Sequence, residues 1–451
     1  MSENKQLQKK DYGGAAFLPL LLFLVLYVGT GLVFTLMGQE GGFGMFPRHV
    51  ALAAGLGLAL IMGRHLTAER KLDIFCENMG NSGIMMVVLI YVLAGGFQGA
   101  AEAMGGKDSV INFALTHIPA AFLVPGIFLM ACFISTAIGT SMGTIAALAP
   151  VAVGVAQGAG LNVPLVCAVV IGGSYFGDNL SMISDTTISA TQGVGAEMKD
   201  KFRMNFFIAL PAAIVSGVLF TVMGGQGLGD VAAPGAYSII KILPYIAVLV
   251  MALAGVNVGV TLLLGIALTG VIGIPMGTDF FDWIAGISSG MSGMFDISIV
   301  AIMVGGIIGL VREYGGIEWL IRTITSKIKK RRGAEYGIGF MCGLLSAALV
   351  NNTIAIIISA PIAKEIGGKY GIAPKRLASL LDIFACAFIT LLPHDGGMLI
   401  VTGLAGCSPL QVLQYMYYPL ALIIATLITI QFGLLRTPEE KEFAKAHPDL
   451  A

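Results

Sequence analysis

Two carboxylates lie in a short polar stretch that interrupts a long apolar run. The stretch extends from Gly177 to Thr187, and its polar side chains are Asp178, Asn179, Ser181, Ser184, Asp185, Thr186 and Thr187. The apolar residues on both sides indicate the depth of a bilayer centre, where one charged side chain costs about 2.5–3.5 kcal/mol. Charges persist there when they face a cavity and have something to bind. The stretch therefore predicts an ion site on an interrupted transmembrane helix.

Three more polar steps interrupt apolar segments elsewhere: the turns Gly139–Thr144 and Val350–Thr353, and the break Pro393–Gly397. Half-helix ends at such steps expose carbonyls and hydroxyls that coordinate cations, and N-termini that attract anions. The alternative for the two turns is a polar surface loop without a ligand, but such loops normally carry charge and these do not. The candidate ion- or substrate-binding residues are therefore Asp178, Asn179, Ser181, Ser184, Asp185, Thr186, Thr140, Ser141, Asn351, Asn352, Thr353, His394 and Asp395.

The composition of this set indicates the class of ion. Carboxylate, amide and hydroxyl oxygens without sulfur ligands suit a proton or a hard cation such as Na⁺, and a zinc site is not expected. Na⁺ and a proton compete for one carboxylate, which is the simplest route to antiport. The predicted Na⁺ ligands are Asp178, Asp185, Thr140 and Ser141.

Two other polar residues keep two interpretations each. His394 is either a proton relay or pH sensor, or a hydrogen-bonded structural histidine. Asp382 lies on the same predicted helix as the second break, and it either joins the site or pairs with a neighbouring polar group away from the site.

The composition is that of a polytopic membrane protein. Of the 451 residues, 56% are hydrophobic and 12% are charged, against roughly 25% charged residues in soluble domains. The net charge of zero suggests no nucleic-acid partner. The six cysteines have no paired spacing and are interpreted as small hydrophobic residues of a helix bundle. The first apolar run, 13–36, is predicted to be a span rather than a cleaved signal peptide.

Apolar runs that approach the ~20 residues needed to cross a bilayer are found along the whole chain. They lie near 13–36, 46–64, 82–104, 200–224, 236–255, 257–274, 295–314 and 409–435. The segments with polar interruptions are 119–160, 163–193, 334–371 and 376–405. Two amphipathic pieces, 107–118 and 317–332, are predicted to lie at the membrane interface.

The interrupted segments occur twice in the same order. The motif Gly95-Gly96-x-x-Gly99 recurs as Gly305-Gly306-x-x-Gly309, offset by 210 residues, and Ala149-Pro150 recurs as Ala360-Pro361, offset by 211. These recurrences predict two homologous halves, 1–226 and 235–435, and a tail, 436–451. The first half would contain a re-entrant hairpin (119–160) and a broken helix (163–193), and the second half the same pair (334–371 and 376–405).

The distribution of basic residues predicts that the second half is inverted. Each half would cross the membrane five times, and an odd number of crossings turns the next half over. With a cytoplasmic N-terminus, the inside segments hold most lysines and arginines, including Lys201, Arg331 and Arg376, while the outside loops keep Arg48 and Lys107. The predicted fold class is an all-α polytopic membrane protein of two inverted-topology repeats, with both termini and the tail cytoplasmic.

The polar stretch also resembles a known family signature. Ser174 to Thr187, with Gly177-Asp178-Asn179-Leu180-Ser181 and Ser184-Asp185-Thr186-Thr187, is similar to the Gly-Asp-Lys-x-Ser-Pro-x-Ser-Asp-Thr-Thr pattern of NhaC-type sodium/proton antiporters, in the ion-transporter superfamily. The turn Ser135–Thr144 resembles the first hairpin of that family. Asn179 stands where the family pattern has lysine, and Met182 where it has proline. The resemblance implies cation/proton exchange, and related members exchange organic acids or amino acids.

Three hypotheses follow for the activity. The first is a Na⁺/H⁺ antiporter of the cell inner membrane that exchanges cytoplasmic Na⁺ for H⁺ by alternating access, with Asp178 and Asp185 as carriers. The alternative is a Na⁺- or H⁺-coupled transporter of a small organic anion or amino acid. In that case Asn351, Asn352 and Thr353 would bind a carboxylate and Asn179 would accommodate an amino group. The third is a membrane-embedded enzyme that uses His394 and Asp395, which is disfavoured because no nucleophile stands in register with them.

The expected partners follow from these hypotheses. They are Na⁺, H⁺ and the lipid bilayer, with a small carboxylate or amino acid in the alternative, and no cofactor is expected. The sequence leaves open the stoichiometry, the preference between Na⁺ and Li⁺, and the oligomeric state, a homodimer included.

Overall fold

The chain is built from helices. The computed structural model describes residues 12–37, 46–182, 184–225, 235–254 and 256–447, and these residues form helices and loops without any strand. They group into two compact units, which are described separately below. Unit 1 comprises residues 1–88 and 296–327, and unit 2 comprises residues 89–295 and 328–451, each as far as it is described.

Unit 1 contains the first predicted spans and one segment from the second predicted half. Its elements are a 3-10 turn at Gly13–Phe17, α1 (Leu18–Leu24), a π-helical turn at Val25–Gly29, α2 (Thr30–Leu36), α3 (Arg48–Ile61), α4 (Ala68–Met79), the start of α5 (Ser82–Ala103), most of α15 (Phe295–Glu313) and α16 (Gly316–Thr325). A side chain at the start of α3 and a backbone carbonyl near its end join it to the α15–α16 segment. The Asp296 carboxylate accepts from His49 Nδ1 at 2.8 Å, and the buried Tyr314 hydroxyl donates to the Ala59 carbonyl at 2.7 Å.

Helix α4, a charged amphipathic helix for which the sequence analysis predicted no element, packs on the glycine face of α15. A methyl group added at Gly306 or Gly309 would collide with the side chains of Phe75 and Asn78. The glycines of the repeated motif thus let the two helices approach closely, as small residues do in membrane proteins.

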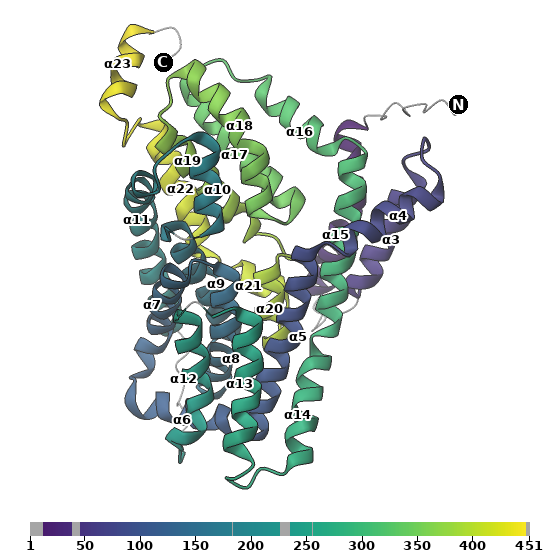
Figure 1. Ribbon diagram of the computed structural model, residues 1–451, viewed down its shortest axis with the longest axis vertical. Helices are drawn as coiled ribbons and strands as arrows, with labels where there is room; N and C mark the ends of the chain where they lie inside the picture. Colours follow the sequence, from purple (N-terminus) through teal and green to yellow (C-terminus); the bar gives the residue numbers. More distant parts are fainter. Residues whose placement is uncertain (1–11, 38–45, 183, 226–234, 255, 448–451) are drawn as a thin grey trace. The chain divides into compact units, whose positions relative to one another are not determined.

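Unit 2 contains both predicted hairpins and both broken helices. Its elements up to α14 are the rest of α5, α6 (Gly106–His117), α7 (Ala120–Ile138), α8 (Ser141–Gly158), α9 (Val163–Leu180), α10 (Asp185–Val194), α11 (Met198–Gly225), α12 (Ile239–Leu253), α13 (Val258–Gly273) and α14 (Phe280–Gly293). Its later elements are α17 (Arg331–Leu349), α18 (Asn352–Tyr370), α19 (Pro374–Ile389), α20 (Gly396–Ala405), α21 (Pro409–Leu413), α22 (Tyr417–Gln431) and α23 (Pro438–Ala446). Figure 1 shows α17, α18 and α19 grouped toward one end of this unit and α7, α8 and α9 farther along it.

The helix pairs α7–α8 and α17–α18 are the two predicted hairpins, and α9–α10 and α19–α20 are the two predicted broken helices. Equivalent contacts hold them together. The Ser135 hydroxyl donates to the Ser174 carbonyl, and 211 residues later the Ser346 hydroxyl donates to the Ala385 carbonyl. This match supports the internal repeat, whereas the inverted orientation and the boundaries of the halves remain predictions.

Helix α14 was not expected from the sequence, which predicted a connection between the spans 257–274 and 295–314. It lies about one repeat offset from α4, and it packs on α5 as α4 packs on α15. A methyl group added at Gly286 would lie 2.7 Å from the Gly99 carbonyl oxygen, and one at Gly290 would collide with the Gly95 carbonyl. Each glycine motif therefore packs on a helix from the other predicted half.

Within the described residues, six helical segments are long and apolar enough to cross a membrane. They are Ser82–Ala103, Ala121–Ile138, Ser141–Gly158, Val163–Val194, Met198–Gly224 and Phe280–Glu313. The hairpin and break helices α8 and α9 are mostly buried, whereas one face of α7 exposes Phe122, Leu129 and Phe133. An exposed face made of such large apolar side chains suits contact with lipid.

Two basic residues that the sequence analysis assigned to inside segments are buried in an ion-pair network. Arg331 pairs with Glu335 at 3.3 Å and with Glu440 of α23 at 2.6 Å, and Arg376 pairs with Glu335 at 3.1 Å. All four side chains are at most 3% exposed. Arg331 and Arg376 therefore connect the hairpin α17–α18, helix α19 and the tail, in addition to any effect on topology.

Candidate functional site

The centre of the candidate site is Asp178, in the last turn of α9. Its carboxylate is 2% exposed and accepts hydrogen bonds on both oxygens. One comes from the Ser141 hydroxyl at 3.0 Å and the other from the Ser184 hydroxyl. The Thr186 hydroxyl lies 2.9 Å from that of Ser184 and extends the network. The first hairpin tip and the first helix break, which are far apart in sequence, thus meet at one buried carboxylate.

The local structure around the break explains why these hydroxyls are available. Helix α9 ends at Leu180 and α10 begins at Asp185, with Ser184 in the N-cap position. An N-cap serine normally accepts from a backbone amide of the first turn. The Ser184 side chain makes no such cap bond and donates to Asp178 instead. The site therefore uses a capping residue as a carboxylate ligand.

The second hairpin tip meets the other aspartate of the break. The Thr353 hydroxyl, at the start of α18, donates to Asp185 Oδ2 at 2.8 Å, and the backbone amide of Thr186 donates to Asp185 Oδ1 at 3.1 Å. Asp185 is an exposed residue, unlike Asp178. The structure therefore brings both predicted tips to the stretch 178–186, but places its two carboxylates in different environments.

Three other predicted residues at the tips serve local structure. The Thr140 and Asn351 side chains cap α8 and α18 by accepting from Gly143 N and Ile354 N. The Asn352 amide approaches Cys386 Sγ at 3.6 Å. Val350 precedes the second cap with φ +47°, a left-handed conformation that is strained for a β-branched residue. Such strain is concentrated at functional sites.

The second break lies beside the first hairpin. Asp395 is 2% exposed and caps α20 by accepting from the amides of Gly397 at 3.0 Å and Met398 at 3.3 Å. Its neighbour His394 is also buried, at 7% exposed. A methyl group added at Gly396 would lie 3.0 Å from the Met142 side chain, next to Ser141. Both predicted residues are thus near the first tip, but the Asp395 carboxylate is directed to its own helix.

A buried ion pair next to the break was missed by the sequence analysis. Lys201 and Asp382 are at most 1% exposed, and Lys201 Nζ lies 2.7 Å from Asp382 Oδ2. The Asn205 amide also donates to this oxygen, at 2.8 Å. Asp382 thus pairs with neighbouring polar groups, but these groups lie beside the break and not away from the site. The distribution of basic residues places Lys201 in an inside segment and gives it no role at the site. Asn205 follows it by one turn, and that polar stripe on an apolar helix was the available signal.

Lys201 also holds the two halves of the broken helix. Its ammonium group donates to the Asn179 carbonyl at 2.8 Å and to the Thr187 hydroxyl at 2.6 Å. The Thr187 hydroxyl in turn donates to the Ser181 carbonyl at 2.8 Å. The Asn179 side chain is buried and lies beside the Tyr418 hydroxyl. Asn179 and Ser181 therefore contribute backbone carbonyls at the break.

The carboxylates near the break differ in how their negative charge is compensated. Asp185 and Asp382 both lie near enough to Asp178 to interact with it electrostatically. Asp382 is neutralised by Lys201, whereas the recorded partners of the Asp178 carboxylate are hydroxyl groups. A buried carboxylate surrounded by hydroxyls can take up a proton or a small cation, because either one offsets its charge.

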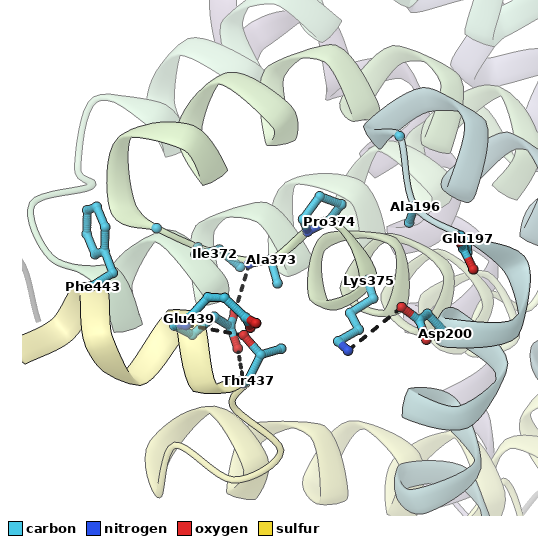
Figure 2. Close-up of a pocket in the computed structure, with 13 residues that line it drawn as sticks. Ala196, Glu197, Asp200, Ile372, Ala373, Pro374, Lys375, Thr437, Glu439 and Phe443 are labelled. Carbon is cyan, nitrogen blue, oxygen red and sulfur yellow. Dashed lines mark hydrogen bonds and ion pairs between the residues drawn. The ribbon is translucent and has the colours of Figure 1, made fainter.

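A surface pocket of about 480 Å³ lies elsewhere in unit 2, between the start of α11, the α18–α19 loop and α23. Figure 2 shows Lys375 directed toward Asp200 across this pocket, with Thr437 and Phe443 on the α23 side. None of the predicted binding residues lines it. The pocket is therefore separate from the Asp178 site.

The model of a family described as "Na+/H+ antiporter family" matches residues 15–225 and 228–436. An arginine/ornithine antiporter, ArcD, of Halobacterium salinarum is 22% identical over 96% of this chain and 95% of its own length. The Na⁺/H⁺ antiporter NhaC of Alkalihalophilus pseudofirmus is 22% identical over 88% of this chain and 92% of its own length.

One further relative aligns over a smaller part of the chain, and one solved structure aligns with a lower sequence identity. A malate-2H⁺/Na⁺-lactate antiporter of Bacillus subtilis is 30% identical over 46% of this chain, and the match spans 44% of that relative. Among solved structures, the Alcanivorax borkumensis YdaH transporter aligns over 93% of this chain and 99% of its own, with 14% identity and a TM-score of 0.37.

Proposed function

This chain belongs to the Na⁺/H⁺ antiporter family, and on that premise we propose that it exchanges Na⁺ for H⁺ at the Asp178 carboxylate. Membership of this family and the long apolar helices make it a multi-pass membrane protein. We further propose that Na⁺ and H⁺ are the ions that this chain transports, that the protein lies in the inner membrane, and that it takes Na⁺ from the cytoplasm.

The observation that supports the proposal most directly is the Asp178 network. A Na⁺ ion at Asp178 would have the carboxylate and the hydroxyls of Ser141 and Ser184 as oxygen ligands, and its arrival would displace a proton from the carboxyl group. Asp185 would guide either ion between the solvent and Asp178, because it is exposed and contacts the second tip. One carboxylate then carries Na⁺ in one direction and H⁺ in the other.

The test of this proposal is flux through purified protein in proteoliposomes. A Na⁺ gradient, without any organic solute, should drive proton movement that a pH-sensitive dye reports. Asp178→Asn should abolish it, and Asp178→Glu should retain part of it, because the glutamate keeps the charge but shifts its position. Asp282→Asn, at an exposed position of α14, is the matched control and should behave as wild type. Full exchange by Asp178→Asn would refute the assignment of this residue.

The second candidate for the transported substrate is an organic solute, and the names of two relatives support it. The arginine/ornithine antiporter aligns over nearly the whole chain, and a malate/lactate antiporter aligns over part of it. In this case Asn351, Asn352 and Thr353 would bind the solute carboxylate. The same proteoliposomes, loaded with labelled arginine, ornithine, malate or lactate, separate the candidates: solute exchange without Na⁺-driven proton movement would replace the first proposal with the second.

A further inference from the structure

The ammonium group of Lys201 lies in a cage of three oxygens. Its partners are Asp382 Oδ2 at 2.7 Å, the Thr187 hydroxyl at 2.6 Å and the Asn179 carbonyl at 2.8 Å. Each of its three N–H bonds therefore has an acceptor, and the side chain is fully buried. We refer to Asp382, Thr187 and Asn179 as the ammonium cage.

The ammonium cage has the composition of a cation site. The Asn179 carbonyl is close to the C-terminal end of half-helix α9, where the helix dipole is negative. A carboxylate, a hydroxyl and a freed carbonyl at a helix break are the oxygen donors that bind Na⁺ in transporters with interrupted helices. The cage thus offers to Lys201 the kind of ligands that the Asp178 site offers to a free ion.

Polar groups around the cage add to this capacity. Asn205 donates to both the Asn179 carbonyl and Asp382 Oδ2, which fixes these two acceptors relative to each other. The Asn205 side-chain oxygen is buried and has no hydrogen-bond partner among the described residues. A buried polar atom without a partner is rare, and the Asn205 oxygen is a candidate for a further ligand next to the cage.

We infer that the ammonium cage is a second cation site at the helix break, and that the chain fills it with its own lysine. The ligand class is a monovalent cation, either Na⁺ or a primary alkylammonium ion. In the native protein the tethered ammonium joins α9, α10 and α19 and excludes a free ion from the carboxylate of Asp382. The inference does not depend on exchange at Asp178, because it concerns other ligands.

The test is to empty the cage and refill it from solution. Lys201→Ala is prepared together with Asp178→Asn, so that binding at the proposed exchange site does not contribute. The protein is purified with N-methylglucamine as the sole cation, and methylammonium, ethylammonium or Na⁺ is then titrated while Tm and calorimetric heat are measured. A saturable rise in Tm with one bound cation per chain is expected, and no such rise in the Asp178→Asn parent.

The control is the addition of Asp382→Asn, which removes the charged ligand and should abolish the rise. A second variant, Lys201→Gln, covers the case in which Lys201→Ala does not fold. It keeps a hydrogen-bond donor but leaves the Asp382 charge unpaired, so Na⁺ should produce the same Asp382-dependent rise. The absence of a saturable rise in the folded variant, or an equal rise after Asp382→Asn, would overturn the inference.

Discussion

Single residues at the helix break differ more in environment than in type. Asp178 and Asp185 lie in one stretch, yet the first is buried among hydroxyls and the second is exposed beside Thr353. Asp382 is a third carboxylate nearby, and Lys201 neutralises it. Among these three carboxylates, Asp178 therefore combines burial with neutral partners, which is the condition for exchange between a proton and a cation.

The hydroxyl ligands of Asp178 should matter for affinity rather than for turnover. A hydrogen bond to a charged group contributes about 1.5–3 kcal/mol. We therefore expect Ser184→Ala, and separately Ser141→Ala, to raise the Na⁺ concentration for half-maximal exchange about 10-fold or more in proteoliposomes. Ser292→Ala, at an exposed position of α14, is the control. An unchanged Na⁺ dependence in both serine variants would show that neither hydroxyl binds the ion.

Much of this site was predictable, because polar residues in an apolar run have few structural explanations. Such residues identified both turns and both breaks, and the structure brings Ser141 and Thr353 to the stretch that contains Asp178 and Asp185. The role of Lys201 was not predictable from charge alone, because a lysine at a helix start usually lies in solvent. Likewise, the cap role of Asp395 depends on backbone amides whose directions are set only by the fold.

At the level of helices, small residues decide which elements meet. The motif of α5 approaches α14 closely enough that glycine backbones touch, and the related motif of α15 packs on α4. Helix α4 was not predicted because its charged residues lower its hydropathy below that of a span, and α14 because its 14 residues are fewer than a span needs. The glycine recurrence in α5 and α15, in contrast, was visible in the sequence.

A methyl group at this contact should destabilise the protein. Gly99→Ala would put its Cβ against the Gly286 carbonyl, so the helices must separate, at a cost of about 1–3 kcal/mol. Thermal unfolding in detergent should show a lower Tm. The matched control is Gly126→Ala on α7, where the added methyl group meets nothing within 4 Å. If both variants had the same Tm as wild type, the close contact would be wrong.

At the scale of the whole molecule, the tail is part of the folded structure as far as it is described, to residue 447. Glu440 of α23 is 2% exposed and accepts from Arg331, from the Ala373 amide at 2.8 Å and from the Thr437 amide at 2.7 Å. Arg331 belongs to the second hairpin, and Ala373 lies before α19. The tail therefore fixes the end of that hairpin in unit 2.

Loss of the Glu440 carboxylate should loosen the tail. Glu440→Ala leaves Arg331 without one of its two acidic partners, and breaking a buried pair costs about 3–5 kcal/mol. We expect a lower Tm and faster hydrogen exchange throughout α23. Glu442→Ala, exposed on the same helix, should change neither quantity. Slow exchange of α23 in Glu440→Ala would indicate that other contacts hold the tail.

The glycine contacts of α5 with α14 and of α15 with α4 have a consequence for splitting the gene of this protein into two parts. Helix α5 finds its close-packed neighbour in α14, encoded in the second half, and α15 finds its own in α4, encoded in the first. A gene cut between the codons for Gly225 and Gly235 would yield two polypeptides, each lacking a partner for its glycine face. We expect that neither polypeptide accumulates when it is expressed alone, and that co-expression of both restores the α5–α14 and α15–α4 contacts.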